Sequence, residues 1–81
     1  MKLFVKNIQK EINEAQLEEI FAEYGEIVET KIIYDKITWE SRGFGFVDFA
    51  KKTDAHKAID GLNGKELQGK IVSVEIALEK R

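Results

Sequence analysis

The stretch RGFGFVDF, residues 42–49, decides the fold prediction because its residues alternate in kind from one position to the next. Side chains of a β-strand point alternately to the two faces of a sheet. The small or apolar positions are Gly43, Gly45, Val47 and Phe49. The positions between them, with a charge at each end, are Arg42, Phe44, Phe46 and Asp48. Since the charged set has to face water, Phe44 and Phe46 are expected on the open face of a sheet and Phe49 in the core.

Three more strands are predicted, two before this stretch and one after it. They are expected where β-branched and other apolar residues alternate or cluster, at residues 3–7, 27–35 and 70–77. In the first of them, Leu3 and Val5 are expected to point into the core, so Phe4 and Lys6 point to the open face. The turn-rich residues 63–69 are expected to hold a small hairpin.

Two amphipathic helices are predicted between these strands. Asn13 and Gln16 have the spacing of a capping box at the start of the first helix. Its apolar stripe consists of Leu17, Ile20, Phe21 and Tyr24. The predicted cap of the second helix is Thr53. The buried stripe of that helix consists of Ala55, Ala58, Ile59 and Leu62.

This order of elements predicts an α+β fold, the ferredoxin-like β-α-β-β-α-β sandwich. It has a four-stranded antiparallel sheet with both helices on one face. The length of 81 residues suits a single domain over residues 1–81. Because the first and third strands form the central pair in this topology, Phe4 is expected beside Phe44 and Phe46. The cations expected around the three rings are Lys6, Lys31 and Arg42, with Lys2 as a further one.

Composition and charge narrow the function. The net charge is −2, yet seven acidic residues and no basic ones lie between Glu11 and Glu29, which leaves 13 basic and eight acidic residues elsewhere. The side away from the acidic segment can therefore attract an anion.

The chain has no cysteine, so the sequence predicts neither a disulfide nor a thiolate metal site. No apolar run approaches the roughly 20 residues of a membrane span, and the charged N-terminus does not resemble a signal peptide. An intracellular location, cytoplasmic or nuclear, is expected.

Exposed aromatic rings bordered by cations fit unpaired nucleotides, because every base has a flat face that can stack and every phosphate is an anion. A different explanation is that the rings are covered by a partner protein or by the chain's own C-terminal tail.

Two segments resemble the RNA recognition motif family. RGFGFVDF satisfies every defined position of its octamer, Lys/Arg-Gly-Phe/Tyr-Gly/Ala-Phe-Val-any-Phe/Tyr. Residues 3–8, LFVKNI, are similar to its hexamer, with Ile8 where leucine is usual. The resemblance implies that Phe4, Phe44 and Phe46 stack on bases and sugars and that Arg42 contacts a phosphate. It also implies single-stranded RNA as the partner, and no catalysis, catalytic residue, metal or cofactor.

Some positions differ from the family's usual pattern. Trp39 stands where glycine is common. It is expected either to pack on Tyr34 or Ile37 or to fold over a bound nucleotide. In the last strand, alternation places Ser73 and Glu75 on the RNA face, where basic or amide side chains are frequent.

The sequence thus predicts a single-stranded RNA-binding module, with single-stranded DNA as an alternative ligand and no membrane association. The predicted contact residues are Phe4, Lys6, Lys31, Trp39, Arg42, Phe44 and Phe46. Two other functions stay open at this point. One is a protein-interaction module that uses the sheet or the helix face. The other is a small enzyme of the acylphosphatase type, which needs an arginine in an anion-binding loop and an active-site asparagine. The sequence argues against it, because Asn7 and Asn63 are better placed as turn residues and no glycine loop that could cradle a phosphate is present.

Overall fold

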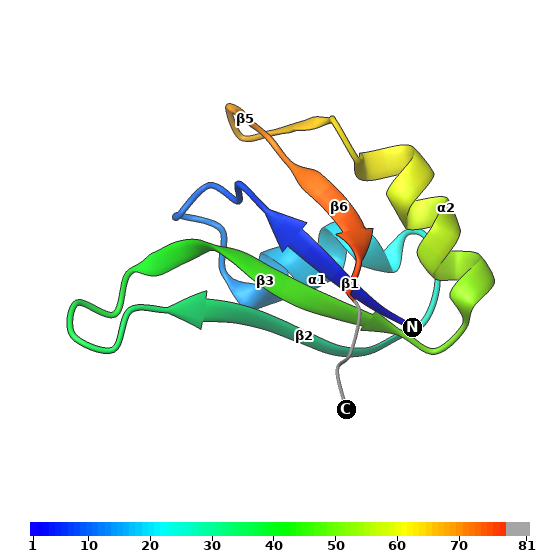
Figure 1. Ribbon diagram of the computed structural model, residues 1–81, viewed down its shortest axis with the longest axis horizontal. Helices are drawn as coiled ribbons and strands as arrows, with labels where there is room; N and C mark the ends of the chain where they lie inside the picture. The colour runs from blue at the N-terminus through cyan, green and yellow to red at the C-terminus, as the bar shows by residue number, and fades with distance from the viewer. Residues whose placement is uncertain (78–81) are drawn as a thin grey trace.

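The computed structural model describes residues 1–77 and has the predicted order of elements, with a small hairpin inserted before the last strand (Figure 1). The elements are β1 (Lys2–Lys6), α1 (Glu14–Ala22), β2 (Ile27–Tyr34), β3 (Ser41–Phe49), α2 (Lys52–Leu62), β4 (Glu66–Leu67), β5 (Lys70–Ile71) and β6 (Ser73–Ile76). Within this described part of the chain, no helix is long and apolar enough to cross a bilayer.

The four long strands form one antiparallel sheet in the order β2-β3-β1-β6, which confirms β1 and β3 as the central pair (Figure 1). Leu3, Val5, Val47 and Phe49 on one face of the sheet are at most 1% exposed. They share a single core with residues of both helices, among them Leu17, Phe21, Ala55, Ala58 and Leu62. Both helices therefore cover the same face, and the opposite face of the sheet is open.

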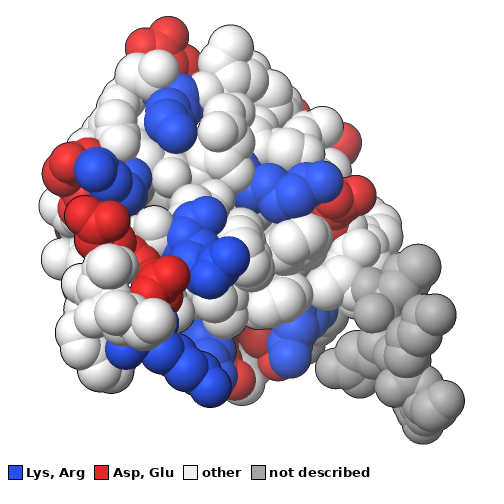
Figure 2. Space-filling model, turned by 60° about the vertical axis from the view of Figure 1, so that its left-hand side comes forward, with Lys and Arg blue, Asp and Glu red and all other residues white. Residues whose placement is uncertain are grey.

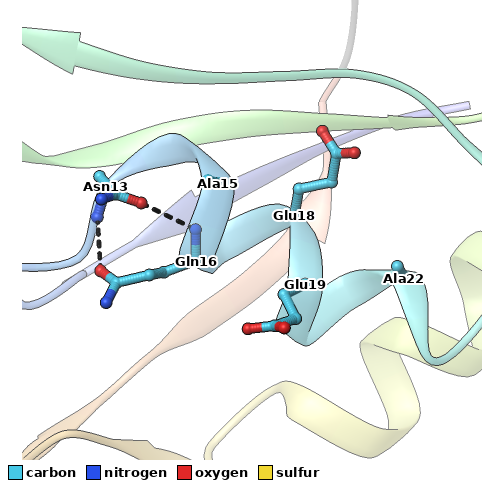
Figure 3. Close-up of a pocket in the computed structure, with 6 residues that line it drawn as sticks. All are labelled: Asn13, Ala15, Gln16, Glu18, Glu19 and Ala22. Carbon is cyan, nitrogen blue, oxygen red and sulfur yellow. Dashed lines mark hydrogen bonds between the residues drawn. The ribbon is translucent and has the colours of Figure 1, made fainter.

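The start of α1 is as predicted. The side-chain oxygen of Asn13 accepts a hydrogen bond from the Gln16 amide at 2.8 Å, and the Gln16 side chain accepts one from the Asn13 amide at 3.0 Å (Figure 3). These bonds satisfy backbone donors that the first turn of a helix leaves free. From the predicted stripe, Leu17 and Phe21 are buried, and Ile20 and Tyr24 pack against the core.

The predicted cap of α2 is wrong. The helix begins at Lys52, its N-cap is Lys51 without a side-chain hydrogen bond, and Thr53 lies inside the first turn. The chain needs only two residues to pass from β3 into α2, so the helix starts before it reaches the threonine. Its first turn instead carries Asp54, whose negative charge suits a helix N-terminus. The burial of Ala55 attaches the same turn to the core.

The single strand predicted at residues 70–77 is divided in two. Lys70–Ile71 pair with Glu66–Leu67 in the predicted hairpin, and only Ser73–Ile76 join the main sheet. Gln68 and Gly69 both have positive φ, 51° and 93°, as a tight two-residue hairpin turn requires. The buried Val72 lies between β5 and β6. Its carbonyl accepts a hydrogen bond from the amide of Gly64, and its amide donates one to the carbonyl of Lys65.

The neighbouring strand explains why β3 carries a glycine, Gly45, in the middle of the sheet. A Cβ atom at this position would overlap the carbonyl oxygen of Lys31 and the Cα of Ile32 in the neighbouring strand. Strand alternation puts Gly45 on the core face, but the neighbour that excludes a side chain there is the β2 backbone. Gly45 thereby lets β2 approach closely and places Lys31 opposite Phe46.

Candidate nucleic-acid interface

Three phenylalanine rings form a cluster at the centre of the open face. Phe4 and Phe46 lie directly opposite each other in the β1–β3 register, and their rings are stacked with centroids 5.2 Å apart. Phe44 meets Phe4 edge-on, with centroids 5.7 Å apart and an interplanar angle of 79°. All three rings are half-buried rather than fully exposed, because each covers part of another. The strand alternation predicted this face correctly, and the mutual packing gives the rings fixed orientations.

Two lysines of β1 lie over these rings. The Nζ atom of Lys2 is 5.7 Å from the centroid of Phe46, and that of Lys6 is 5.7 Å from the centroid of Phe4. Both distances fall within the range of cation–π attraction. Lys2 has the same parity as Phe4 and Lys6, so strand alternation accounts for its place on this face.

Two of the predicted cations are paired with carboxylates. Lys6 Nζ lies 3.1 Å from Glu75 Oε2, and Arg42 Nη1 lies 3.6 Å from Asp35 Oδ2. Both pairs are well exposed to solvent, and such pairs contribute only about 0–1 kcal/mol to stability. A phosphate can therefore compete for either cation at little cost. The third predicted cation, Lys31, is exposed beside Phe46 on the open face.

The strand β6 brings an acid to the same face. Glu75 lies opposite Phe4 and Ser73 lies opposite Lys6 in the β1–β6 register, while Val74 between them is buried. This confirms the predicted parity of the strand. Glu75 therefore stands beside the ring cluster and next to the cation of Lys6.

The β2–β3 loop is organised by Asp35. Its carboxylate accepts hydrogen bonds from the backbone amides of Ile37 and Thr38 at 2.8 and 3.1 Å. These two bonds, together with the charge of Arg42, hold the pKa of the Asp35 carboxyl below its ordinary value. The backbone carbonyl of Asp35 also accepts from the amide of Trp39 at 2.9 Å. Asp35 thus fixes the course of the chain through the loop.

Trp39 is an exposed residue of this loop. Its φ is +63°, in the left-handed region that favours glycine, which is a physical reason for glycine at this position. Trp39 is 75% exposed and Ile37 is 89% exposed, so the expected packing of Trp39 on Ile37 is wrong and most of the Trp39 surface is open to solvent. Beside the loop, an open groove adjoins Phe44 and is lined by Ile33, Tyr34, Asp35, Lys36, Ile37, Arg42 and Phe44.

Charges are mixed on the side of the molecule that carries this loop. Figure 2 shows basic side chains distributed over uncharged surface there, several of them next to acidic ones. A second hollow lies on the outer side of α1, lined by Asn13, Ala15, Gln16, Glu18, Glu19 and Ala22 (Figure 3). Its charged side chains, Glu18 and Glu19, are both acidic, so this surface repels phosphates and the open face of the sheet is the better candidate for RNA.

Comparisons with known proteins agree with this geometry. Residues 3–73 match the sequence model of the RNA recognition motif. The chain is 42% identical over 98% of its length to glycine-rich RNA-binding protein 3, mitochondrial, from Arabidopsis thaliana, of which it covers 26%. It therefore spans about a quarter of that relative. It superposes on the crystal structure of RNA-binding protein PG1 with a TM-score of 0.94 and 36% identity, covering 100% of this chain and 98% of that one. It superposes on a complex of the SXL-lethal protein with RNA with a TM-score of 0.90 and 38% identity, covering 94% of this chain and 47% of that one.

Proposed function

We propose that this chain, which belongs to the RNA recognition motif family, is a module that binds single-stranded RNA across the open face of its sheet. The observation that carries the proposal is the cluster of Phe4, Phe44 and Phe46 at the centre of that face, with lysines at its border. Flat rings suit unpaired bases, and the lysines suit the phosphates that link them. The relatives described above, named as RNA-binding proteins, support the same ligand.

Two rings are oriented to stack on bases and the third to contact an edge. Phe4 and Phe46 are nearly parallel, with 24° between their planes, so each can carry one base. Phe44 stands at 79° to Phe4 and can contact the sugar or the base edge between them. Lys2 and Lys6 have to move aside when bases arrive. The cation–π contact that each gives up is worth about 0.5–1 kcal/mol at an exposed site, whereas stacking is worth about 1–3 kcal/mol per base. The gain from stacking a base therefore exceeds the loss of the cation–π contact.

The cations bind the phosphates weakly. Lys31, Arg42, Lys6 and Lys2 are the available groups, and two of them first have to leave a carboxylate partner. With about two to four phosphates neutralised, the logarithm of affinity should fall with that of salt by roughly 0.7 per phosphate. Since stacking gains are also partly offset by the cost of association, we expect dissociation constants on the order of micromolar or weaker.

Trp39 extends this surface beyond the sheet. A bulky residue in the left-handed region is strained by about 1–3 kcal/mol, and such strain is often found where a side chain serves a ligand. Together with the groove beside Phe44, the exposed Trp39 ring can take one more nucleotide of a longer RNA. Trp39→Ala should then weaken binding of an octanucleotide several-fold and leave binding of a trinucleotide unchanged. Equal loss for both lengths would contradict this role.

The same surface accepts single-stranded DNA with lower affinity, because stacking is common to both ligands and only the 2′-hydroxyl differs. No catalysis is part of the proposal. Asn7 donates a hydrogen bond from its side chain to the backbone carbonyl of Ile71, as expected of a residue that holds a turn rather than one that reacts with a substrate. A protein partner would use the helix face, which the proposed RNA surface leaves free. We retain an intracellular location, and the mitochondrial relative adds an organelle to the cytoplasm and nucleus as locations.

Chemical-shift mapping tests the proposal. Titration with oligouridine should shift the backbone amides of β1 and β3 and leave those of α1 unchanged. Phe4→Ala should weaken the interaction by about 1–3 kcal/mol. A matched control is Phe4→Tyr, which keeps a flat ring and should bind nearly as well. Shifts confined to α1, or no change on Phe4→Ala, would instead favour a protein-interaction module.

A further inference from the structure

One ion pair borders the ring on which a base is expected to stack. Glu75 lies directly opposite Phe4 across the β1–β6 pair, and Lys6 follows Phe4 by two residues on the same face. Lys6 Nζ is 3.1 Å from Glu75 Oε2 and 5.7 Å from the centre of the Phe4 ring. A base that stacks on Phe4 displaces the Lys6 amine from the face of the ring, and because this amine is paired with Glu75, both charged groups then border the same edge of the base.

The two side chains offer complementary chemistry. An ionised carboxylate only accepts hydrogen bonds, through two oxygens, and an ammonium group only donates. Side by side they present two acceptors and a donor. The Watson–Crick edge of guanine has the opposite pattern, with adjacent donors at N1 and N2 and an acceptor at O6. Guanine can therefore satisfy all three positions at once with charge-assisted hydrogen bonds.

The other bases match this pair less well. On the same edge, adenine, cytosine and uracil each place a single donor group beside acceptor atoms. One carboxylate oxygen then remains unbonded or faces a lone pair, so these bases form fewer favourable contacts. The difference does not depend on ring size, because adenine is a purine like guanine and has a similar stacking area.

We propose that Glu75 and Lys6 select guanine for the nucleotide that stacks on Phe4. The inference rests on the proposed function, since it requires a base on that ring. It also gives Glu75 a role, because a carboxylate next to a phosphate-binding cation opposes RNA unless it hydrogen-bonds to a base. Bidentate recognition of a base usually discriminates by a factor of about 5 to 150. Both side chains are about half exposed, 49% and 52%, so the lower part of that range, roughly 5- to 10-fold, is expected here.

The test compares pentanucleotides that differ only at the centre, UUGUU, UUAUU, UUCUU and UUUUU, by fluorescence anisotropy. The uridine flanks let the variable base reach the favoured ring in any register. UUGUU should bind roughly 5- to 10-fold more tightly than each of the others. Inosine at the centre, which lacks the N2 amine, should lose most of this advantage. In contrast, 7-deazaguanine keeps the same edge and should retain it.

The variant Glu75→Gln tests the residue itself. An amide keeps the shape but presents only one acceptor, so the guanine preference should fall to within about twofold. The matched control is Glu19→Gln on the outer side of α1, which makes the same chemical change and should keep the preference. A guanine preference that persists in Glu75→Gln would overturn the inference. Equal affinity of the wild-type protein for the four pentanucleotides would also overturn it. In that case the proposed function would still stand if Phe4→Ala weakened the binding. Absence of binding to all four would defeat both.

Discussion

Phe46 and Phe49 are three residues apart in the chain and lie on opposite faces of strand β3. Phe49 is 1% exposed and packs at a tilt against Phe21 of α1, with ring centroids 6.4 Å apart. Phe46 is half-buried against Phe4 and has the Lys2 amine over its ring. The same residue type thus serves the core on one face and an open, cation-bordered surface on the other.

The difference shows that strand parity, rather than residue type, decides the role of a ring in this sheet. The open face is apolar at its centre, which stability alone does not require, because its rings gain only partial burial. The core face cannot be changed without disturbing the packing of α1. The predictions below test this separation, from the largest expected effect to the smallest.

Truncation of the core ring should have the largest effect. Phe49→Ala leaves a cavity beneath α1 and should lower the free energy of unfolding by about 3–5 kcal/mol, as measured by urea denaturation. The matched control is Phe44→Ala on the open face, which should cost less than half as much. If both variants lose the same stability, the two faces are not distinct in the way described.

The close approach of β2 to β3 should be the next most sensitive feature. Gly45→Ala places a methyl group against the β2 backbone, and overpacking of this kind costs about 1–3 kcal/mol. Gly69→Ala is the control for the opposite cause, because its φ of +93° is unfavourable for alanine while no atom lies within 4 Å of the added Cβ. A larger loss for Gly69→Ala would show that β2 adjusts freely to a side chain at Gly45.

A charge reversal beside the ring cluster should have a smaller effect, and on binding only. Glu75→Lys releases Lys6 from its ion pair and adds a cation, so oligouridine should bind several-fold more tightly at low salt. One such contact is worth on the order of 0.5–1 kcal/mol, and the gain should shrink as salt rises. Glu19→Lys on α1 makes the same change in net charge and should have little effect. Equal gains for both variants would indicate a long-range field instead of a contact.

Acidification should produce the smallest effect, confined to the β2–β3 loop. Because the folded-state pKa of Asp35 is lowered, the stability from its ionised form is fully present above the ordinary value of 3.8, and its hydrogen bonds to the loop are lost as pH falls through the lowered pKa. The fluorescence of Trp39 should therefore change in that acidic range. Asp35→Asn should abolish this change, whereas Asp60→Asn, on the exposed side of α2, should leave it intact.

Alternation and helical periodicity were sufficient to predict the order of elements, the face of each ring and much of the core, but not the buried Ile8 and Ile12. These patterns repeat along the chain, so Phe4, Phe44 and Phe46 could be assigned without knowledge of distant contacts. The capping box of α1 was also predictable, because both of its partners lie within one turn.

Features that depend on contacts between distant segments could not be predicted in this way. The division of the last strand follows from the pairing of Lys70–Ile71 with the hairpin, and the reason for Gly45 is the course of the neighbouring strand. The partners of Lys6 and Arg42 depend on side-chain conformations across strands and loops. The sequence therefore predicted which cations reach the open face but not that carboxylates already hold two of them.

The measurement that tests the central claim most directly is the RNA affinity of Phe46→Ala beside its free energy of unfolding. We predict that oligouridine binds more weakly by about 1–3 kcal/mol, the value of one stacked base. The free energy of unfolding should change by less than about 1.5 kcal/mol, because the ring contributes an aromatic contact but only partial burial. Unchanged affinity together with a loss of several kcal/mol in stability would contradict the claim that this face of β3 is a binding surface.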